Sequence, residues 1–156
     1  MHKKRWPLIG LVVVLLVVVG GGGYWYVSHA AAKKVPGNTF RYQSVSKDKT
    51  LYVTFAATGD KAVVNPDRNT VLTAANSQAD FDKAYAAQSQ DATWRYSVAA
   101  SSLTLAKADK DGQISQWQYN GIIALGKKLT SRSFTYQIAK AGQGQVKSKT
   151  TFEKIN

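Results

Sequence analysis

The feature that most constrains the fold of this chain is a period of two in its large apolar residues, which begins near residue 39. Apolar side chains alternate with polar ones in stretches that contain Phe40 and Tyr42; Leu51, Val53 and Phe55; Trp94, Tyr96 and Val98; Leu103 and Leu105; Trp117, Tyr119, Gly121, Ile123 and Leu125; Phe134, Tyr136 and Ile138; and Val146 through Phe152. Successive side chains of a strand point to opposite faces, so this pattern indicates half-buried antiparallel strands. We therefore predict a mainly β domain over residues 39–156.

Turn-forming residues separate these stretches and set the number of strands. They occur at 47–49, 58–61, 65–69, 109–112 and 141–144, where Asp, Asn, Gly, Lys and Pro are concentrated. One stretch departs from the alternation: Ser77 and Asp80 have the spacing of a capping box, and Phe81 and Tyr85 lie four residues apart. We expect seven or eight strands in a closed or nearly closed antiparallel barrel or sandwich, with one short helix at about 77–89.

The alternating aromatic and aliphatic residues are the candidates for the interior of this domain. Strict alternation is what one buried sheet face requires, so we expect these side chains to fill the barrel or to face a ligand within it, rather than to form an exposed stacking surface. The set comprises Phe40, Tyr42, Leu51, Val53, Phe55, Trp94, Tyr96, Trp117, Tyr119, Phe134 and Tyr136.

A second strong feature lies at the N-terminus, where no Lys, Arg, Asp or Glu occurs between Arg5 and Lys33. Residues 8–27 match the length of about 20 residues that a helix needs to cross the hydrocarbon. Trp6 and Trp25 are 19 positions apart, or roughly 28 Å along a helix, and aromatic side chains favour the membrane interface. We therefore predict a transmembrane anchor at 8–27, with Trp6, Tyr24, Trp25 and Tyr26 at the interfaces.

The alternative interpretation is a signal peptide that is cleaved after export. Small residues suitable for a signal peptidase occur at Ser28-His29-Ala30 and at Ala30-Ala31-Ala32. We favour the anchor, with residues 1–7 as a basic cytoplasmic tip, residues 28–38 as a linker and residues 39–156 as an extracytoplasmic domain. The protein is then a single-pass membrane protein with its N-terminus inside; after cleavage it would be secreted instead.

Charge and cysteine content limit the classes of partner and chemistry. The chain of 156 residues has a formal net charge of +12, and the part after Lys34 has 16 basic and 9 acidic residues. Such an excess favours anionic partners, which for an exported domain are wall polymers or lipid headgroups rather than nucleic acid. The sequence has no cysteine, so disulfides and thiolate chemistry are excluded.

The side chains that most often perform catalysis are scarce in the predicted domain. Histidine occurs only at positions 2 and 29, and Glu153 is the single glutamate. We expect the aspartates in turns, Asp48, Asp60, Asp67, Asp109 and Asp111, to bond to local backbone. A calcium loop at 107–118 would lack its first and last carboxylates, and no helix follows Gly142-Gln143-Gly144 as a phosphate loop would require. We therefore expect no metal, no cofactor and no enzymatic activity.

Several of these stretches together carry a resemblance to a known group of proteins. Gly37 to Tyr42, Leu51 to Phe55 with Gly59, Trp94 to Val98 and Ser102 to Leu105 resemble the small lipocalin-like barrels of exported proteins of Gram-positive bacteria, although the glycine-any-tryptophan signature of true lipocalins is absent. The resemblance covers residues 37–156 and implies an up-and-down barrel that holds an apolar ligand.

Two functions are consistent with these observations. The first is a non-enzymatic, membrane-tethered binding module of the cell envelope that holds a small apolar ligand in its barrel. The alternative is a structural or interaction protein that docks on an anionic wall polymer or an envelope protein through basic residues of its last strands. We expect those residues to be Lys127, Lys128, Arg132, Lys147 and Lys149.

Overall fold

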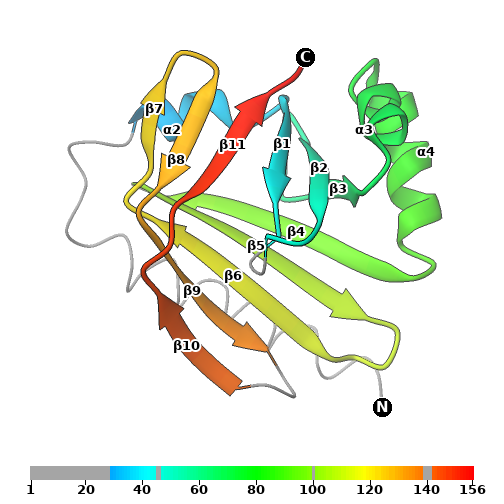
Figure 1. Cartoon of the computed structure of the whole chain (residues 1–156). Helices are drawn as coiled ribbons and strands as arrows, with labels where there is room; N and C mark the ends of the chain where they lie inside the picture. Colours follow the sequence, from blue (N-terminus) through cyan, green and yellow to red (C-terminus); the bar gives the residue numbers. More distant parts are fainter. Residues whose placement is uncertain (1–28, 45–46, 100, 139–141) are drawn as a thin grey trace.

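The computed structural model describes residues 29–44, 47–99, 101–138 and 142–156, which form a mainly β domain with short helices (Figure 1). The helices are α2 (His29–Lys34), α3 (Arg68–Ala74) and α4 (Gln78–Gln88). The strands are β1 (Thr39–Gln43), β2 (Thr50–Phe55), β3 (Ala62–Asn65), β4 (Ala92–Ala99), β5 (Ser102–Asp109), β6 (Ile114–Asn120), β7 (Ile123–Leu125), β8 (Lys128–Ser131), β9 (Ser133–Ile138), β10 (Gly142–Val146) and β11 (Thr150–Lys154).

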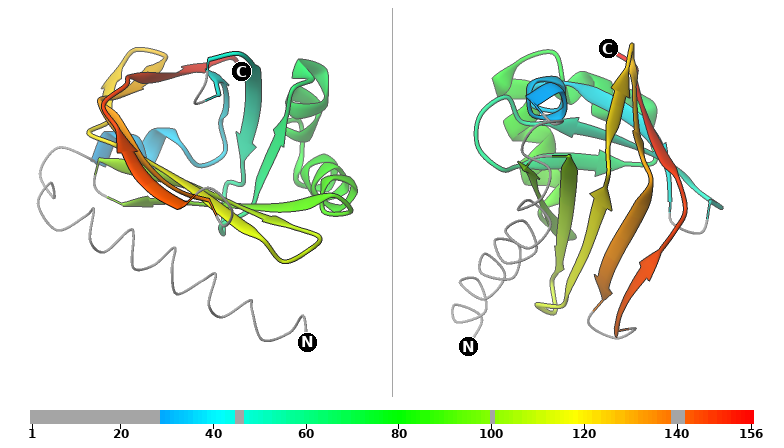
Figure 2. Two further views of the ribbon diagram at one scale, coloured as in Figure 1. Left: turned by 60° about the horizontal axis from the view of Figure 1, so that its bottom comes forward. Right: turned by 90° about the vertical axis from the view of Figure 1, so that its left-hand side faces the viewer.

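The strands form two antiparallel sheets that face each other (Figure 2). The first sheet has the order β3-β2-β1-β11-β8-β7, and the second has the order β10-β9-β6-β5-β4. The sheets meet where Lys61 and Arg95 form an isolated bridge and the Tyr96 N–H donates to the Asp60 carbonyl at 2.7 Å. Because this is a single bridge and not a ladder, the described strands form two sheets. The closed barrel among our predicted architectures is therefore wrong, and two facing antiparallel sheets agree with the sandwich alternative.

The number of strands was also predicted incorrectly, for a geometric reason. Three chain segments pass from one sheet to the other and break in the middle: β6 continues into β7, β8 into β9, and β10 into β11. The breaks lie at Gly121-Ile122, at Arg132 and at residues 147–149. The described chain therefore has eight strand segments but eleven strands. The expected turn at Gly142-Gln143-Gly144 is instead part of β10, which pairs with β9.

The break at Gly121 also changes which side chains point inward. Gly121 has φ +63°, a conformation that glycine adopts without the steric cost other residues incur. It shifts the alternation by one residue, so that Ile122 is buried while Ile123 and Leu125 are 43% and 75% exposed. Our prediction that Ile123 and Leu125 share the buried face of Trp117 and Tyr119 is therefore wrong.

The main core lies between the two sheets and is rich in aromatic residues. All eleven side chains that we predicted for the interior belong to it or pack against it. Phe152 of β11 stacks on Tyr42 with ring centroids 4.8 Å apart and meets the edge of Tyr119 at 4.9 Å. Phe55 packs edge-on against Tyr96 at 4.7 Å. The sequence pattern thus identified the side chains that face this core, but on β5 and β6 it missed that Thr104, Gln116 and Gln118 of the other face are also buried.

Helix α2 belongs to this core, although we expected residues 28–38 to be a linker. It contacts β4 and β7 and lies between the two sheets (Figure 2). Ala31 and Val35 are 3% and 0% exposed and are members of the main cluster. The linker prediction relied on Lys33, Lys34 and the Pro36-Gly37-Asn38 turn, and it overlooked that small and apolar residues interrupt these signals.

The other two helices cover the outer side of β2 and β3. Helix α4 lies at the position predicted for a helix, with Ser77 as its N-cap accepting from the Asp80 N–H at 3.1 Å. Helix α3 was not predicted, because we interpreted Asn65-Pro66-Asp67 only as a turn, whereas Asp67 caps this helix. Together they bury a second apolar cluster, which comprises Ala56, Val63, Val71, Ala74 and Phe81.

Within the described ranges, no helix has the length and apolarity needed to cross a membrane. The predicted basic tip at 1–7, the predicted span at 8–27 and its interface residues Trp6, Tyr24, Trp25 and Tyr26 lie outside the described residues.

Candidate anion-binding face

The five cationic residues that we predicted to contact a polyanion lie on strands and links of the C-terminal part of the chain. Lys127 and Lys128 lie at the turn between β7 and β8, Arg132 lies at the corner between β8 and β9, and Lys147 and Lys149 lie in the link between β10 and β11. All five side chains are exposed. We refer to this set as the basic face.

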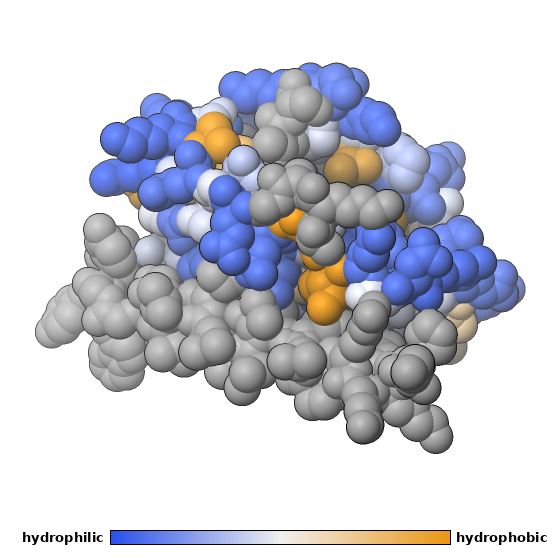
Figure 3. All heavy atoms as spheres, turned by 90° about the horizontal axis from the view of Figure 1, so that it is seen from below, coloured by the Kyte–Doolittle hydropathy of each residue, from blue (hydrophilic) through white to orange (hydrophobic). Residues whose placement is uncertain are grey.

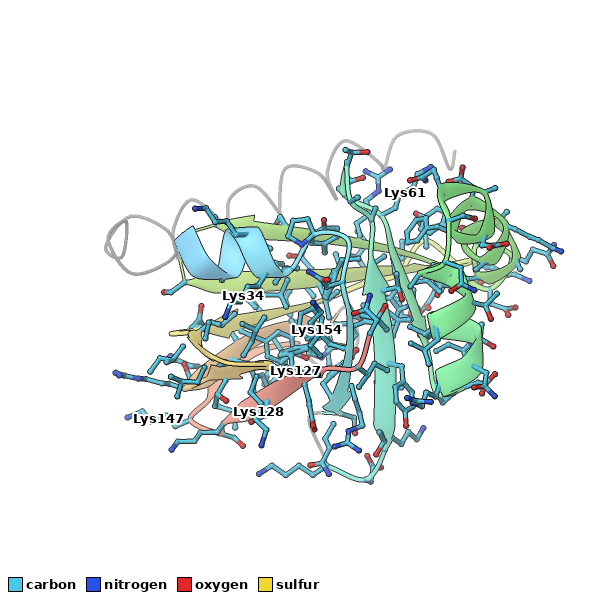
Figure 4. The ribbon with its side chains drawn as sticks, turned by 90° about the horizontal axis from the view of Figure 1, so that it is seen from above. Lys34, Lys61, Lys127, Lys128, Lys147 and Lys154 are labelled. Carbon is cyan, nitrogen blue, oxygen red and sulfur yellow. The ribbon has the colours of Figure 1, made fainter. Side chains whose placement is uncertain are left out.

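The side chains of the basic face are held by the strands that carry them. Lys128 is opposite Leu125 on β7 and opposite Glu153 on β11. Arg132 lies over Gly121, where a Cβ atom would be 3.4 Å from two carbons of its side chain. In the view from above, Lys127, Lys128 and Lys147 lie on the same side of the molecule, whereas Lys61 lies on the far side (Figure 4).

The charges of the chain are distributed unevenly between two parts. Residues 35–111, the balanced part, have nine basic and eight acidic residues. Residues 112–156, the basic part, have seven basic residues and one acidic residue, Glu153. The Glu153 carboxylate accepts from the Arg41 guanidinium at 2.6 Å. Among the described residues, therefore, no member of the basic face has a carboxylate within ion-pair distance.

Acidic groups of the balanced part are used within that part. Three of its ion pairs join Asp60 to Arg95 at 3.5 Å, Asp109 to Lys107 at 3.4 Å and Asp91 to Lys110 at 3.9 Å. Asp67 accepts from the backbone N–H groups of Asn69 and Thr70 and from the Thr70 hydroxyl. The hydrogen bond from the Thr70 hydroxyl is the main reason that the pKa of Asp67 is lowered.

A polar cleft lies beside the basic face, where β1 and β11 separate. The two strands pair only at Phe40 with Lys154 and at Arg41 with Glu153. Beyond these pairs they leave a cleft of about 370 Å³, which Lys47 and Lys149 line together with Arg41. Its other lining residues are Tyr42, Gln43, Ser44, Thr50, Ser148, Thr150, Thr151 and Glu153. Lysines and hydroxyl groups together suit an anion that accepts hydrogen bonds.

The aromatic side chains predicted to face a ligand are instead occupied with one another. Phe40, Phe55, Phe134 and Phe152 are essentially fully buried, and Trp94 stacks on Trp117 at 5.7 Å. Desolvation by burial raises the pKa of Tyr119. Two causes raise the pKa of Tyr42: the larger is desolvation by burial, and the smaller is the electrostatic effect of the neighbouring Tyr119. Both hydroxyl groups are therefore neutral at physiological pH, as a closely packed apolar core requires.

The described residues offer no group with the composition of a metal centre or a catalytic triad. No cluster of three or more His, Asp or Glu side chains able to hold a metal occurs among them. The loop at 109–113 is a hairpin turn, in which the Asp109 N–H donates to the Gln113 carbonyl at 2.9 Å.

The face seen from below is mainly hydrophilic where it is coloured, with small separate hydrophobic patches (Figure 3).

Two relevant lysines, Lys34 and Lys154, were not predicted as functional residues. Lys34 fell in the supposed linker, and Lys154 fell at the end of a strand whose register only the structure gives.

No protein-family model, curated protein or solved structure matches this chain.

Proposed function

We propose that the protein is a non-enzymatic module tethered to the outer side of a cell membrane, and that its basic face binds an anionic polymer of the cell envelope. The observation that carries this proposal is the separation of charge: the basic part has seven basic residues and one acidic residue, which is bound to Arg41, whereas the balanced part has nine basic and eight acidic residues. Exposed cations without partners attract polyanions in a way that depends on salt.

The arrangement also supports a repeating ligand over a single small anion. Lys128 begins β8 and Arg132 follows its last residue, so the two are at most about 13 Å apart at about 3.3 Å per residue. The cleft between β1 and β11 adds Lys47 and Arg41 next to Lys149. A chain of phosphate groups can contact such separated cations together, and each contact adds to the total affinity.

Binding of the full chain in neutral detergent to immobilised poly(glycerol phosphate) tests this function. We expect affinity to fall steeply between about 50 and 500 mM salt, because exposed charges are screened over this range. The variant K128Q/K147Q/K149Q should bind at least about tenfold more weakly. A tenfold loss of affinity corresponds to only about 1.4 kcal/mol, which we expect the loss of three charged contacts to reach.

The matched control removes the same charge from the balanced part. R68Q/K83Q/K110Q also loses three positive charges, and all three positions are exposed. We expect it to bind within about twofold of the wild-type chain if the position of the charges matters, and not only the net charge. Equal losses in the two triple variants, or binding that is independent of salt, would contradict the proposal.

An apolar ligand in the interior is the weaker function, because the predicted ligand-facing side chains pack against each other. Delipidated and native protein should have the same unfolding midpoint if the interior holds no ligand.

The lipocalin-like likeness is a separate proposal about the origin of the fold. It is supported by the order of the eight strand segments. Each segment except the third pairs with the next one along the chain, and the last pairs with the first.

The tether itself is a proposal that N-terminal sequencing of the mature protein tests. An intact N-terminus in the membrane fraction supports the single-pass anchor. A mature chain that starts near Ala31 or Lys33 would instead support cleavage and secretion.

A further inference from the structure

A small pocket at one end of the domain brings together lysines from three separate elements. It lies between α2, the β7–β8 turn and β11, and its volume is about 160 Å³. In the view from above, Lys34, Lys127 and Lys154 lie around this end of the molecule (Figure 4). Its lining residues are Lys34, Asn38, Phe40, Gly126, Lys127, Leu129 and Lys154.

Each lysine reaches the pocket for a definite structural reason. Lys34 is the last residue of α2, and its ammonium group donates to the Gly126 carbonyl at 3.3 Å. Lys154 is opposite Phe40 in the antiparallel pair of β11 and β1, so it lies on the inner face of the sheet with that buried ring. The backbone of Lys127 is fixed because its carbonyl accepts from the Lys154 N–H at 2.7 Å.

No carboxylate lines this pocket to balance the three positive charges. Glu153 is adjacent to Lys154 in sequence, but it lies on the outer face of β11, where it binds Arg41. All nine acidic residues of the sequence lie in the described ranges, and none forms an ion pair with Lys34, Lys127 or Lys154. Three like charges around one small space are stabilised when an anion enters it.

The floor of the pocket is apolar, in contrast to its rim. Phe40 and Leu129 are 2% and 1% exposed and form the base beneath the lysines. The pocket's volume of about 160 Å³ is less than half that of the cleft between β1 and β11 and has room for a phosphate group. Cations above a buried apolar floor fit a molecule that is both anionic and apolar.

The position of the pocket in the chain supports a membrane lipid as its source of phosphate. At most about 7 Å of extended chain separate Val27, the end of the predicted span, from His29, the first residue of α2. Helix α2 then rises about 1.5 Å per residue to Lys34. This step rests on the proposed tether, which would hold Lys34 within about 15 Å of the membrane core.

We propose that the pocket formed by Lys34, Lys127 and Lys154 binds the phosphate of an anionic phospholipid headgroup from the membrane that anchors the chain. The bound lipid would orient the end of the domain that carries α2 and the β7–β8 turn toward the bilayer. The other residues of the basic face, such as Lys128 on the opposite side of the sheet, would remain available to the envelope polymer.

Native mass spectrometry of the full chain, released from micelles with equal amounts of phosphatidylglycerol and phosphatidylcholine, tests the site. We expect the wild-type chain to retain one phosphatidylglycerol in preference. Selectivity should fall about tenfold in both K34Q and K154Q, because each loses a charge-assisted hydrogen bond. In K128Q, which removes an adjacent charge from the outer face, it should change by less than about twofold.

The controls distinguish a lipid site from a folding defect and from a site for soluble anions. Thermal unfolding reports whether K154Q folds, and K34Q tests the site independently because Lys34 is exposed on the short helix α2. Unchanged selectivity in K34Q and K154Q, or an equal loss in K128Q, would overturn the proposal. Inorganic phosphate that competes as well as the lipid would overturn the lipid assignment in favour of a soluble anion. Loss of polymer binding with intact lipid selectivity would refute only the proposed function.

Discussion

The balanced part and the basic part of this chain contribute to one core but use their charges differently. In residues 35–111, carboxylates cap a helix and pair with nearby cations, as Asp67 and Asp60 illustrate. In residues 112–156, the single carboxylate binds Arg41 of the other part, and the remaining exposed cations have no acidic partner in the described chain. Local structure therefore uses several carboxylates of the first part, whereas the exposed cations of the second part are left to solvent or to the anionic partner that we propose.

The largest expected effect tests whether the basic part is structurally essential. Phe152 of β11 is fully buried between Tyr42 and Tyr119. F152A should lower the free energy of unfolding by about 3–5 kcal/mol, because it leaves a cavity in a rigid core. The exposed control K149A should stay within about 0.5 kcal/mol. Denaturant unfolding measures both, and similar small effects would mean that the basic part is only appended to the core.

A pH titration tests whether the two parts share that core as one unit. Burial raises the pKa of Tyr42, from the balanced part, and of Tyr119, from the basic part. The folded state binds these protons more tightly than the unfolded state, so their contribution is complete below about pH 10 and is lost as the pH rises. We expect a loss of about 1.4 kcal/mol per tyrosine for each pH unit above about 10.

The variant Y119F provides the control for this titration. It removes one of the two ionisable groups, so its stability should fall less steeply above pH 10 than that of the wild-type chain. Comparing the two chains cancels the titration of the lysines. Identical slopes would contradict the burial of Tyr119.

A glycine of the basic part tests how closely its strands are packed. A Cβ atom at Gly144 of β10 would lie 2.5 Å from the Tyr136 hydroxyl oxygen. G144A should therefore cost about 1–3 kcal/mol of unfolding free energy through overpacking. The exposed neighbour Q143A should change it by less than about 0.5 kcal/mol. If G144A and Y136A have additive effects in a double-mutant cycle, the two side chains do not meet.

The smallest expected effect sharpens the view that charges of the balanced part serve local structure. The folded pKa of Asp67 is lowered, so the stability it provides is present above its ordinary pKa and is lost as the pH falls through the folded value. D67N should keep the helix cap but lose this acid dependence. Unfolding midpoints between pH 3 and pH 7 measure the difference, and parallel curves for D67N and wild type would argue against it.

Sequence alternation predicted the buried faces of the strands better than it predicted their number. The eleven interior residues were identified because alternation is a local property of each strand. The corners at Gly121, Arg132 and residues 147–149 were missed, since a strand that changes sheets keeps its hydrophobic character on both sides of the bend. The shift at Gly121 then exposed Ile123 and Leu125, which sequence spacing had placed inside.

The residues of the candidate sites were likewise predicted only in part from the sequence. Lys127, Lys128, Arg132, Lys147 and Lys149 could be selected as a group because charge is visible in the sequence. The sequence by itself determined the β class, the inward aromatic residues, the helix at α4 and the cationic C-terminal part, because these depend on period and composition. Only the tertiary structure decided that α2 enters the core and that Lys34 and Lys154 meet over Phe40, because antiparallel register and sheet bending bring together residues that are 120 positions apart.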